Sequence, residues 1–337
     1  MTYDMFSTSE IQNKIKQVKK NLLLIADECH NFGTESVQKT LLPSIYSYRI
    51  GLSATVDRNF DLDGTSFIRN FFKGFKFVYS FDEAIKNKHL SEFKYQVVPF
   101  YLSDEEMENY IELSQKITKV SQFGKAHDLK DNETLSSLTI KRSNIIKLAS
   151  DRERAFREVL EEETLKYTLV FVGNLEVDYY CDLLSNEYHY RVARIISETT
   201  IKERKIILDN FDAGLIDVIV CINVLNEGVD VKKAEKLFLL SSSTNPREFI
   251  QRRGRALRLS ANKQYAKIYD FVAFSKDYND PFGLKLLKSQ LKRICLLSYA
   301  SINKYNGLGK VYELCLEENM TYLLDYDYYR EEEEDVN

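Results

Sequence analysis

The sequence predicts an α/β protein with two parallel-sheet domains, the first of them incomplete, and a helical C-terminal extension. At 337 residues the chain is too long for one typical domain. Short continuous apolar runs alternate with helix-like patterns in two separate regions, and this alternation predicts parallel sheets. We therefore expect a first domain, a connecting segment, a second domain and an extension at residues 1–90, 91–165, 166–280 and 281–337.

The first region shows the pattern of a strand, a helix and a second strand. Residues 22–26 are all apolar, which is typical of a parallel strand buried on both faces. Residues 34–42 have a helical pattern that stops at Pro43, and residues 48–55 predict the next strand. These are few strands for a parallel sheet, so we expect this sheet to leave an exposed edge.

The connecting segment begins with an alternating stretch at residues 93–102, which predicts a strand. A helix follows from Ser103 to about residue 120, and its first residues predict a capping box. Residues 121–138 are polar and predict a loop. Residues 138–165 carry apolar side chains at helical spacing and predict one long or broken helix.

The second α/β region alternates more regularly. Its predicted strands are residues 168–172, 191–196, 217–222, 236–240 and 266–272, with helices at 176–184, 201–211 and 246–257. The residues after Pro281 predict further helices, up to an acidic run at 331–335 that we expect to be a solvated tail.

The composition indicates a protein of the cytoplasm. The five cysteines are odd in number and lack metal-like spacing, which indicates reduced thiols. No apolar stretch approaches the roughly 20 residues that span a bilayer, and the first residues lack a secretory pattern, so we expect no membrane partner. The net charge of −4 excludes a wholly basic nucleic-acid coat but leaves room for a local basic groove.

Two adjacent carboxylates, Asp27 and Glu28, follow the apolar run at residues 22–26. Ligands of parallel α/β sheets bind at the carboxyl ends of the strands. Neighbouring residues there point in different directions, so one carboxylate can hold hydrated Mg²⁺ while the other faces an attacking water. His30 could connect this pair to the next motif. An Asp-Glu pair that merely opens a turn is a common alternative, and these residues alone do not exclude it.

Two other short segments close predicted strands. Residues 53–55, Ser-Ala-Thr, offer hydroxyl groups that can bond to the carboxylate motif. Residues 226–230 contain Gly228, which allows a close backbone approach, and Asp230, which could accept a hydrogen bond from a ribose hydroxyl. Each has an ordinary alternative, because Ser and Thr end many strands and glycine occupies many turns.

The segment at residues 251–258 contains four arginines, which is unusual for a plain solvated helix face. Arg255 and Arg258 are three residues apart and share one face if the helix continues. Two guanidinium groups on one face suit a triphosphate, because they are always charged and donate in a planar fork. A basic helix that pairs with acidic neighbours or touches a nucleic-acid backbone is the alternative.

The order and spacing of these segments resemble those of superfamily-two helicases and translocases over roughly residues 1–275. Motifs II, III, IV, V and VI of that family match residues 27–30, 53–55, 169–174, 226–230 and 251–258. Residues 49–55 and 245–252 are similar to the DEAD/DEAH-box branch that includes type III restriction motor subunits and excision-repair helicases.

The resemblance implies two RecA-like domains with ATP in the cleft between them and a nucleic-acid strand across both. It implies that Asp27 binds Mg²⁺ through water and that Glu28 is the catalytic base. It also implies that Ser53 and Thr55, with His30 beside them, couple hydrolysis to strand movement.

The second domain would complete this site. The resemblance implies that Gly228 and Asp230 meet the nucleotide sugar and the strand, and that Gln251 organises the cleft. It implies that Arg255 and Arg258 are arginine fingers on the γ-phosphate. The similarity to restriction enzymes favours DNA over RNA as the nucleic acid.

One part of the family pattern is missing from this sequence. The phosphate-binding loop has the pattern G-x-x-x-x-G-K-[S/T], and its amides and lysine hold the β and γ phosphates. The only Gly-Lys pairs are at 124–125 and 309–310, and neither has a glycine five positions earlier. Val56 also stands where this branch usually has proline.

Two hypotheses follow from this absence. The chain is either the C-terminal portion of an ATP-dependent motor, inactive alone, or a non-catalytic module that binds nucleic acid or a partner through its second domain. For the first, the missing half would come from a companion chain, an alternative start or a sequence that continues upstream. The Asp27–Glu28 pair and the paired arginines have no evident use without a nucleotide, so we favour the first.

Overall fold

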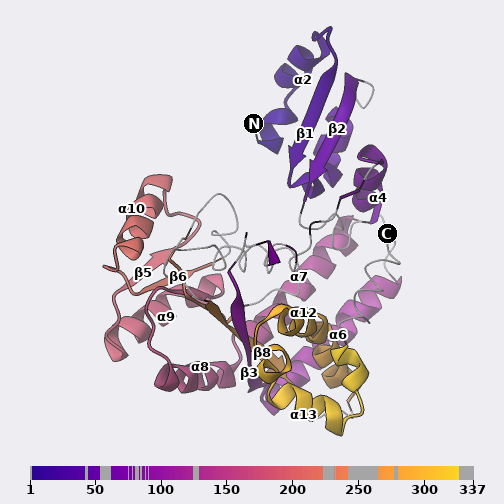
Figure 1. Ribbon diagram of the computed structural model, residues 1–337. Helices are drawn as coiled ribbons and strands as arrows, with labels where there is room; N and C mark the ends of the chain where they lie inside the picture. The colour runs from indigo at the N-terminus through magenta and orange to yellow at the C-terminus, as the bar shows by residue number, and fades with distance from the viewer. Residues whose placement is uncertain are drawn as a thin grey trace. The chain divides into compact units, whose positions relative to one another are not determined.

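The computed structural model describes residues 2–41, 45–53, 62–74, 76–77, 79, 83, 86–87, 89, 91–123, 129–222, 231, 233–241, 265–276 and 280–325. These residues form two compact units, the first up to Tyr79 and the second from there on (Figure 1). Each unit has a parallel sheet, which confirms the predicted α/β class.

The sheet of the first unit has two parallel strands, β1 (Leu22–Asp27) and β2 (Tyr46–Leu52). Its helices are α1 (Tyr3–Phe6), α2 (Ser9–Lys16), the 3₁₀ helix η1 (Cys29–Gly33), α3 (Glu35–Thr40) and α4 (Leu62–Phe71).

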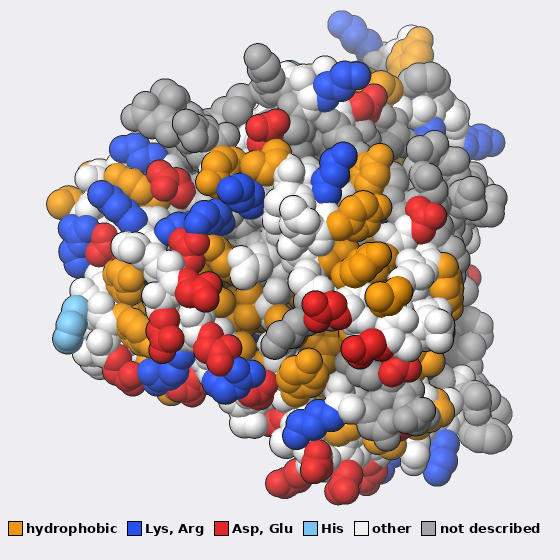
Figure 2. Space-filling view, turned by 60° about the horizontal axis from the view of Figure 1, so that its bottom comes forward, with side chains coloured by type: hydrophobic (Ala, Val, Ile, Leu, Met, Phe, Trp, Pro, Cys, Tyr) orange, Lys and Arg blue, Asp and Glu red, His pale blue; other side chains and the backbone are white. Residues whose placement is uncertain are grey.

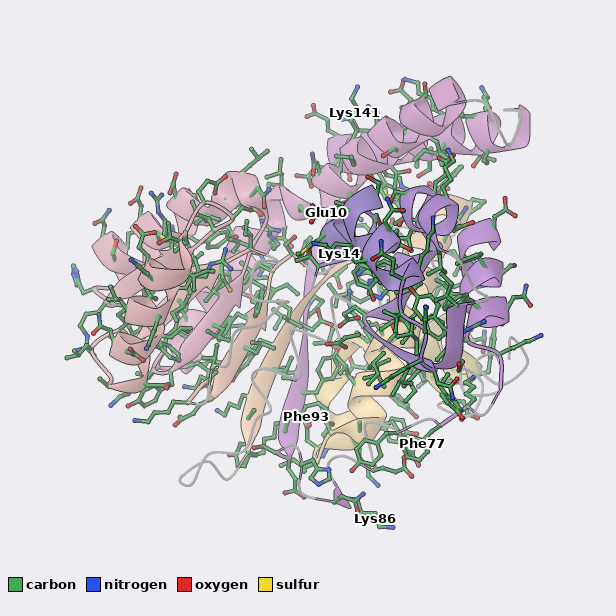
Figure 3. The ribbon with its side chains drawn as sticks, turned by 90° about the horizontal axis from the view of Figure 1, so that it is seen from above. Glu10, Lys14, Phe77, Lys86, Phe93 and Lys141 are labelled. Carbon is green, nitrogen blue, oxygen red and sulfur yellow. The ribbon has the colours of Figure 1, made fainter. Side chains whose placement is uncertain are left out.

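An aromatic core joins these helices to one face of the sheet. Phe32 is its centre, and the rings of Tyr3, Phe6, Phe71 and Phe72 lie with centroids 5.4 to 5.8 Å from its own. The strand residues that pack on this core alternate along β1, and they are Leu22, Leu24 and Ala26. The outer side of α2 is polar, with Glu10 and Lys14 paired at 2.6 Å (Figure 3).

The other face of this sheet differs from the prediction. Leu23 and Ile25 are 51% and 59% exposed, so the expectation that residues 22–26 are buried on both faces is wrong for the described structure. The physical reason is that the core of the first unit gathers on the Leu24–Ala26 side.

The second unit contains a six-stranded sheet in which every neighbouring pair is parallel. The strand order is β3 (Phe93–Tyr101), β8 (Ala266–Phe274), β7 (Lys236–Leu239), β4 (Thr168–Phe171), β6 (Val218–Cys221) and β5 (Val192–Ile195). All residues of β4 and β6 are buried, so both faces of the sheet are covered at its centre. All six strands were predicted from the sequence.

Helices surround this sheet. They are α6 (Asp104–Phe123), α7 (Leu129–Lys147), α8 (Ser150–Glu162), η3 (Asn174–Glu176), α9 (Val177–Asp182), the π-helical turn η4 (Leu183–Glu187), α10 (Ile201–Asp212), α12 (Pro281–Ala300), η6 (Lys304–Gly307), α13 (Lys310–Glu317) and η7 (Thr321–Leu324). None of the helices that the structure describes has an apolar stretch long enough to cross a membrane.

The connecting helices confirm one expectation and correct another. The predicted capping box is present, because Ser103 N donates to Glu106 Oε2 at 2.8 Å and Glu106 N donates to Ser103 Oγ at 3.2 Å. The predicted loop at 121–138 is wrong at 121–123, where α6 continues, and from Leu129 onward, where α7 begins. This polar helix is stabilised by packing along α6, which a local pattern does not show.

The C-terminal helices are tied to the sheet through a buried carboxylate. Asp270 of β8 is fully buried, and Arg293 of α12 donates to both of its oxygens at 3.0 and 3.2 Å. Tyr95 of β3 donates its hydroxyl to Asp270 Oδ2 at 2.9 Å, and burial raises the pKa of this tyrosine well above its ordinary value. One carboxylate thus joins two strands and a helix.

Candidate active site at the end of strand β1

The chain leaves β1 through a residue with left-handed backbone. Asp27 is the last residue of the strand, and its Oδ1 accepts the backbone N–H of Glu28 at 3.0 Å. Glu28 has φ 51° and ψ 51°, a conformation that costs a residue with a long side chain about 1 kcal/mol or more. The chain then turns directly into η1, so the two carboxylates project from successive residues of a sharp turn.

His30 lies between the carboxylate of Glu28 and the hydroxyl of Ser53. Its Nδ1 is 3.3 Å from Glu28 Oε2 and 3.1 Å from Ser53 Oγ. Ser53 directly follows β2, whose last residue pairs with Asp27 in the sheet. The structure therefore brings four of the predicted site residues together at the carboxyl edge of one sheet.

One nitrogen with two partners can serve only one of them as a donor at a time. An Nδ1–H directed at the Glu28 carboxylate is not available to Ser53, whose hydroxyl can then donate elsewhere. The imidazole thus lies between the Glu28 carboxylate and the first residue after β2.

Tyr3 supports the turn from the helical side. Its hydroxyl donates to the backbone carbonyl oxygen of Asp27, and its ring packs edge-on against Phe32. Burial, together with the nearby Cys29 and carboxylates, raises the pKa of this tyrosine, so it is a donor at neutral pH. The sequence analysis missed Tyr3, because a single aromatic residue in a short helix has no distinguishing pattern.

Gly51 allows η1 to approach β2. A β-carbon at this position would lie 3.0 Å from Cys29 Sγ and 3.0 Å from Phe72 Cγ, which is too close for an undisturbed contact. Cys29 is 2% exposed and stands between the two residues that carry the polar groups of the site. The position of His30 thus depends on the absence of a side chain at Gly51.

In the second unit, three adjacent parallel strands end at the same edge. These are β7, β4 and β6, and the chain leaves them at Leu240, Gly173 and Ile222. The connections after β6 and β7 contain the remaining predicted residues except Thr55, which follows β2 in the sequence. Thr55, Gly228, Asp230, Gln251, Arg255 and Arg258 lie outside the described residues, and so do the helix expected at 246–257 and the acidic tail.

A buried arginine joins two of these strand ends. Arg152 of α8 is 2% exposed, donates Nη1 to the carbonyl oxygen of Leu240 at 3.0 Å, and pairs through Nη2 with Glu176. The other oxygen of Glu176 accepts the backbone N–H of Gly173 at 3.1 Å. The sequence analysis missed both charged residues, although the Gly-x-x-Glu spacing at 173–176 is a helix-start signal that could have indicated Glu176.

The described side chains suit a magnesium ion that is bound mainly by a nucleotide. They contain no group of three or more His, Cys, Asp or Glu residues arranged to hold a metal ion. Asp27 offers one exposed carboxylate at a strand end. Mg²⁺ commonly binds one or two carboxylates, several waters and the phosphates of a substrate, so the residues fit this ion only in the company of phosphates.

The outer face of α8 carries balanced charge. Figure 2, with the α8 side of the second unit turned forward, shows basic and acidic side chains interspersed there. The ion pairs that account for this are Arg154 with Asp151 and Glu158, and Arg157 with Glu153 and Glu187. Such a face gives a phosphate backbone little attraction, so we do not place a nucleic-acid contact on it.

Comparison with known proteins identifies the second unit. Residues 151–260 match the model of the helicase conserved C-terminal domain. The chain is 28% identical over 277 residues to the DNA 3'-5' translocase XPB2 of Sulfurisphaera tokodaii, covering 77% of this chain and 60% of that protein. It is 32% identical over 127 residues to UvrABC system protein B of Lactococcus lactis, covering 36% of this chain and 18% of that protein.

A solved structure also aligns with most of the chain. The Sulfolobus solfataricus SWI2/SNF2 ATPase core in complex with dsDNA aligns over 93% of this chain and 75% of its own, with a TM-score of 0.45 and 14% identity. The chain spans less than two thirds of the length of the Sulfurisphaera tokodaii translocase. Residues 151–260 therefore carry a helicase conserved C-terminal domain, and the parallel six-stranded sheet of the second unit agrees with this match.

Proposed function

We propose that this chain is the C-terminal portion of an ATP-dependent DNA helicase or translocase, which hydrolyses ATP only when a phosphate-binding loop is supplied to it. The observation that carries this proposal is the convergence of Asp27, Glu28, His30 and Ser53 at one sheet edge. The similarity to a protein named as a DNA 3'-5' translocase supports DNA rather than RNA. We place this activity in the cytoplasm.

In this proposal the two carboxylates divide the work. Asp27 holds Mg²⁺ through water, and the ion supplies neutralisation of charge on the phosphates. Glu28 accepts a proton from the water that attacks the γ-phosphorus, while the bond from that phosphorus to the bridging oxygen breaks and releases ADP. The strained turn at Glu28 separates the two carboxylates, so that they are available for different tasks.

The other residues act around this centre. His30, Ser53 and Thr55 pass the state of the nucleotide to the nucleic-acid strand, and the shared contact of His30 Nδ1 provides a physical route. Gly228 and Asp230 meet the sugar and the strand, and Gln251 organises the cleft. Arg255 and Arg258 reach the γ-phosphate as arginine fingers.

The missing loop determines what the chain does alone. Each charge-assisted phosphate contact contributes about 1.5–3 kcal/mol, so losing several weakens ATP binding by orders of magnitude. We therefore expect the purified chain to show no ATPase activity with or without DNA, and to gain it when a companion polypeptide with a phosphate loop is added.

The test is ATP hydrolysis by the chain with and without that companion. Glu28→Gln should reduce the restored rate by about 10²–10⁴-fold, because it removes the base and keeps the shape. Glu35→Gln is the matched control, since Glu35 is exposed on α3 of the same unit and pairs only locally with Lys39. Hydrolysis by the chain alone that is lost in Glu28→Gln would contradict the need for a companion.

A second candidate function rests on the completeness of the second unit. Its six-stranded sheet is covered on both faces at its centre, so it can fold and bind without a nucleotide. As a non-catalytic module the chain would bind single strands with strong salt dependence and without any response to ATP. A titration of the chain with single-stranded DNA, with and without ATP and in the presence of the companion, distinguishes this function from the first.

A further inference from the structure

Arg152 places a positive charge where the local structure disfavours one. The residue is almost fully buried, and burial lowers the pKa of its guanidinium. It lies in the first turn of α8, where the helix dipole favours negative charge. Its Nε is buried and has no hydrogen-bond partner among the described residues. The environment of α8 therefore does not explain why an arginine occupies this position.

The two terminal nitrogens of Arg152 reach the exits of two neighbouring strands. Nη1 donates to the carbonyl oxygen of Leu240, the first residue after β7, at 3.0 Å. Nη2 pairs with the buried Glu176, and the second oxygen of this carboxylate accepts the backbone N–H of Gly173 at 3.1 Å. Because β7 and β4 are parallel neighbours, one guanidinium links the points where both strands end.

The backbone around these contacts makes the link specific in position. The N–H of Leu240 donates to the carbonyl oxygen of Phe171 at 3.0 Å, while its own carbonyl oxygen accepts from Arg152. A β-carbon at Gly173 would lie 3.0 Å from Glu176 Oε2, so the carboxylate can lie this close because residue 173 is glycine. The link thus fixes the direction in which the chain leaves both strands.

Another buried ion pair in the same unit serves as a comparison. Arg293 contacts both oxygens of Asp270 at 3.0 and 3.2 Å, and the hydroxyl of Tyr95 donates to the same carboxylate. This pair joins β8, β3 and α12 and does not contact the exits of β4 and β7. A buried ion pair is weak evidence for stability, because apolar side chains of similar volume often replace it without loss. The contacts of Arg152 with two strand ends therefore favour a role in positioning.

The chain that leaves β7 carries residues of the proposed reaction. Residues 241–258 follow this strand in the sequence and contain Gln251, Arg255 and Arg258. In the proposed function the two arginines stabilise charge on the γ-phosphate in the transition state. The rate of such a reaction is sensitive to small displacements of these groups.

We propose that Arg152 is a positioning residue of this ATPase, which together with Glu176 fixes the exits of β4 and β7 and thereby the start of the segment that carries Arg255 and Arg258. This inference rests on the proposed function. It adds to the site a residue of α8 that acts through the backbone and not through contact with the nucleotide.

The test compares kcat and KM for ATP in the full chain supplied with the phosphate-loop companion. Arg152→Met should lower kcat by about 10–100-fold, because misplacing reacting groups by about 1 Å reduces a rate by up to about a hundredfold. KM for ATP should change by less than about threefold, since the arginine fingers act mainly in the transition state. Arg152→Lys keeps the charge but lacks the planar fork, so its kcat should be intermediate.

Two controls separate positioning from stability. Asp270→Asn alters the other buried ion pair and should leave kcat unchanged even if the second unit unfolds more easily. Arg154→Met, in the same helix, removes an arginine whose side chain is 52% exposed and should also leave kcat unchanged. Hydrogen exchange of the chain alone, read by mass spectrometry, is a second measurement. Peptides that contain Gly173 or Leu240 should exchange about tenfold faster in Arg152→Met and at the original rate in Arg154→Met.

The outcomes separate this inference from the proposed function. If the unsubstituted chain with its companion hydrolyses ATP and Arg152→Met has the same kcat, or loses no more than Asp270→Asn, the function stands and the positioning role is overturned. Unchanged exchange at Gly173 and Leu240 in Arg152→Met would also overturn it. If the unsubstituted chain hydrolyses no ATP, the proposed function fails, and exchange still decides whether Arg152 fixes the strand ends. If Arg152→Met does not fold, Arg152→Lys provides the same comparison.

Discussion

The two sheets of this protein are built from the same kind of strand but differ in what covers them. In the second unit, β4 and β6 are buried along their whole length, and each has strand neighbours on both sides. In the first unit, β1 and β2 have only each other in the described structure. Exposed apolar residues alternate with partly or fully buried ones along β1, and Tyr48, Ile50 and Leu52 of β2 are exposed. Apolar strands of this kind need a cover on both faces, and among the described residues both faces are covered only at the centre of the second sheet.

The largest expected effect concerns local stability. Amide hydrogens of β1 should exchange at least about a thousandfold faster than those of β4, a difference of about 4 kcal/mol, because few buried contacts oppose the opening of β1. Native-state hydrogen exchange read by mass spectrometry measures this ratio. Equal protection of the two strands would contradict the contrast between the two sheets. Slower exchange in β1 when the companion is added would support it.

The second prediction tests the covered sheet. Asp270→Asn should lower the free energy of unfolding of the second unit by about 3 kcal/mol, because it removes the fully buried negative charge that Arg293 and Tyr95 contact. Urea unfolding followed by circular dichroism measures the loss. Asp104→Asn is the control, since Asp104 is exposed and its contact with Lys276 is 3.7 Å long. A similar small change in both variants would show that the buried pair does not stabilise this sheet.

A smaller effect is expected where η1 meets β2. Gly51→Ala should destabilise the first unit by about 1–2 kcal/mol, because the new methyl group meets Cys29 Sγ and Phe72 Cγ at 3.0 Å. Adding Cys29→Ala removes one of these contacts and should recover part of the loss. Thermal unfolding of the two single variants and the double variant gives the coupling between the positions. Strict additivity would mean that Gly51 does not position η1.

The smallest expected effect depends on pH. Burial alone would raise the pKa of Glu163, but bonds from Lys267 and Tyr269 and the Lys236 ammonium at 3.0 Å outweigh it and lower this pKa from 4.5 to about 2. The resulting stability, about 1 kcal/mol after screening by solvent, is therefore present above pH 4.5 and is lost as the pH falls toward 2.

Glu163→Gln should remove this dependence. Urea unfolding of the second unit at pH 7 and pH 3.5 measures it, and the difference between the two conditions should shrink in the variant. Glu158→Gln, on the exposed side of α8, should leave the difference unchanged. If the pH dependence of the unfolding free energy persists in Glu163→Gln, it arises from other carboxylates.

The fold could be predicted where burial shows in the sequence. The strands of the second unit are short apolar runs because both of their faces are covered, and all were expected. Residues 22–26 have the same pattern, yet one face of this strand is exposed. Apolar side chains indicate that a strand is more stable when it is covered, but they do not show which residues cover it. The start of α7 was missed, because its stability comes from α6 and not from its own polar residues.

The candidate site was predictable for a different reason. The carboxyl ends of parallel neighbours meet at one edge, so the approach of His30 and Ser53 follows from their positions after two strands. Tyr3 contacts the backbone carbonyl of Asp27, and Arg152 forms a buried ion pair with Glu176. Both contacts join segments that are distant in the sequence. Contacts of this kind depend on three-dimensional packing and leave no local signal.

The backbone of Glu28 has a consequence for how this protein would change over generations. Glycine or asparagine would occupy its left-handed conformation at lower cost, so substitution by either residue is expected to gain stability while it removes the carboxylate. A lineage that no longer needed the carboxylate would be expected to lose glutamate here early. At position 28 this chain therefore carries a carboxylate where glycine or asparagine would fold more favourably, so the backbone and the site make opposite demands on one residue.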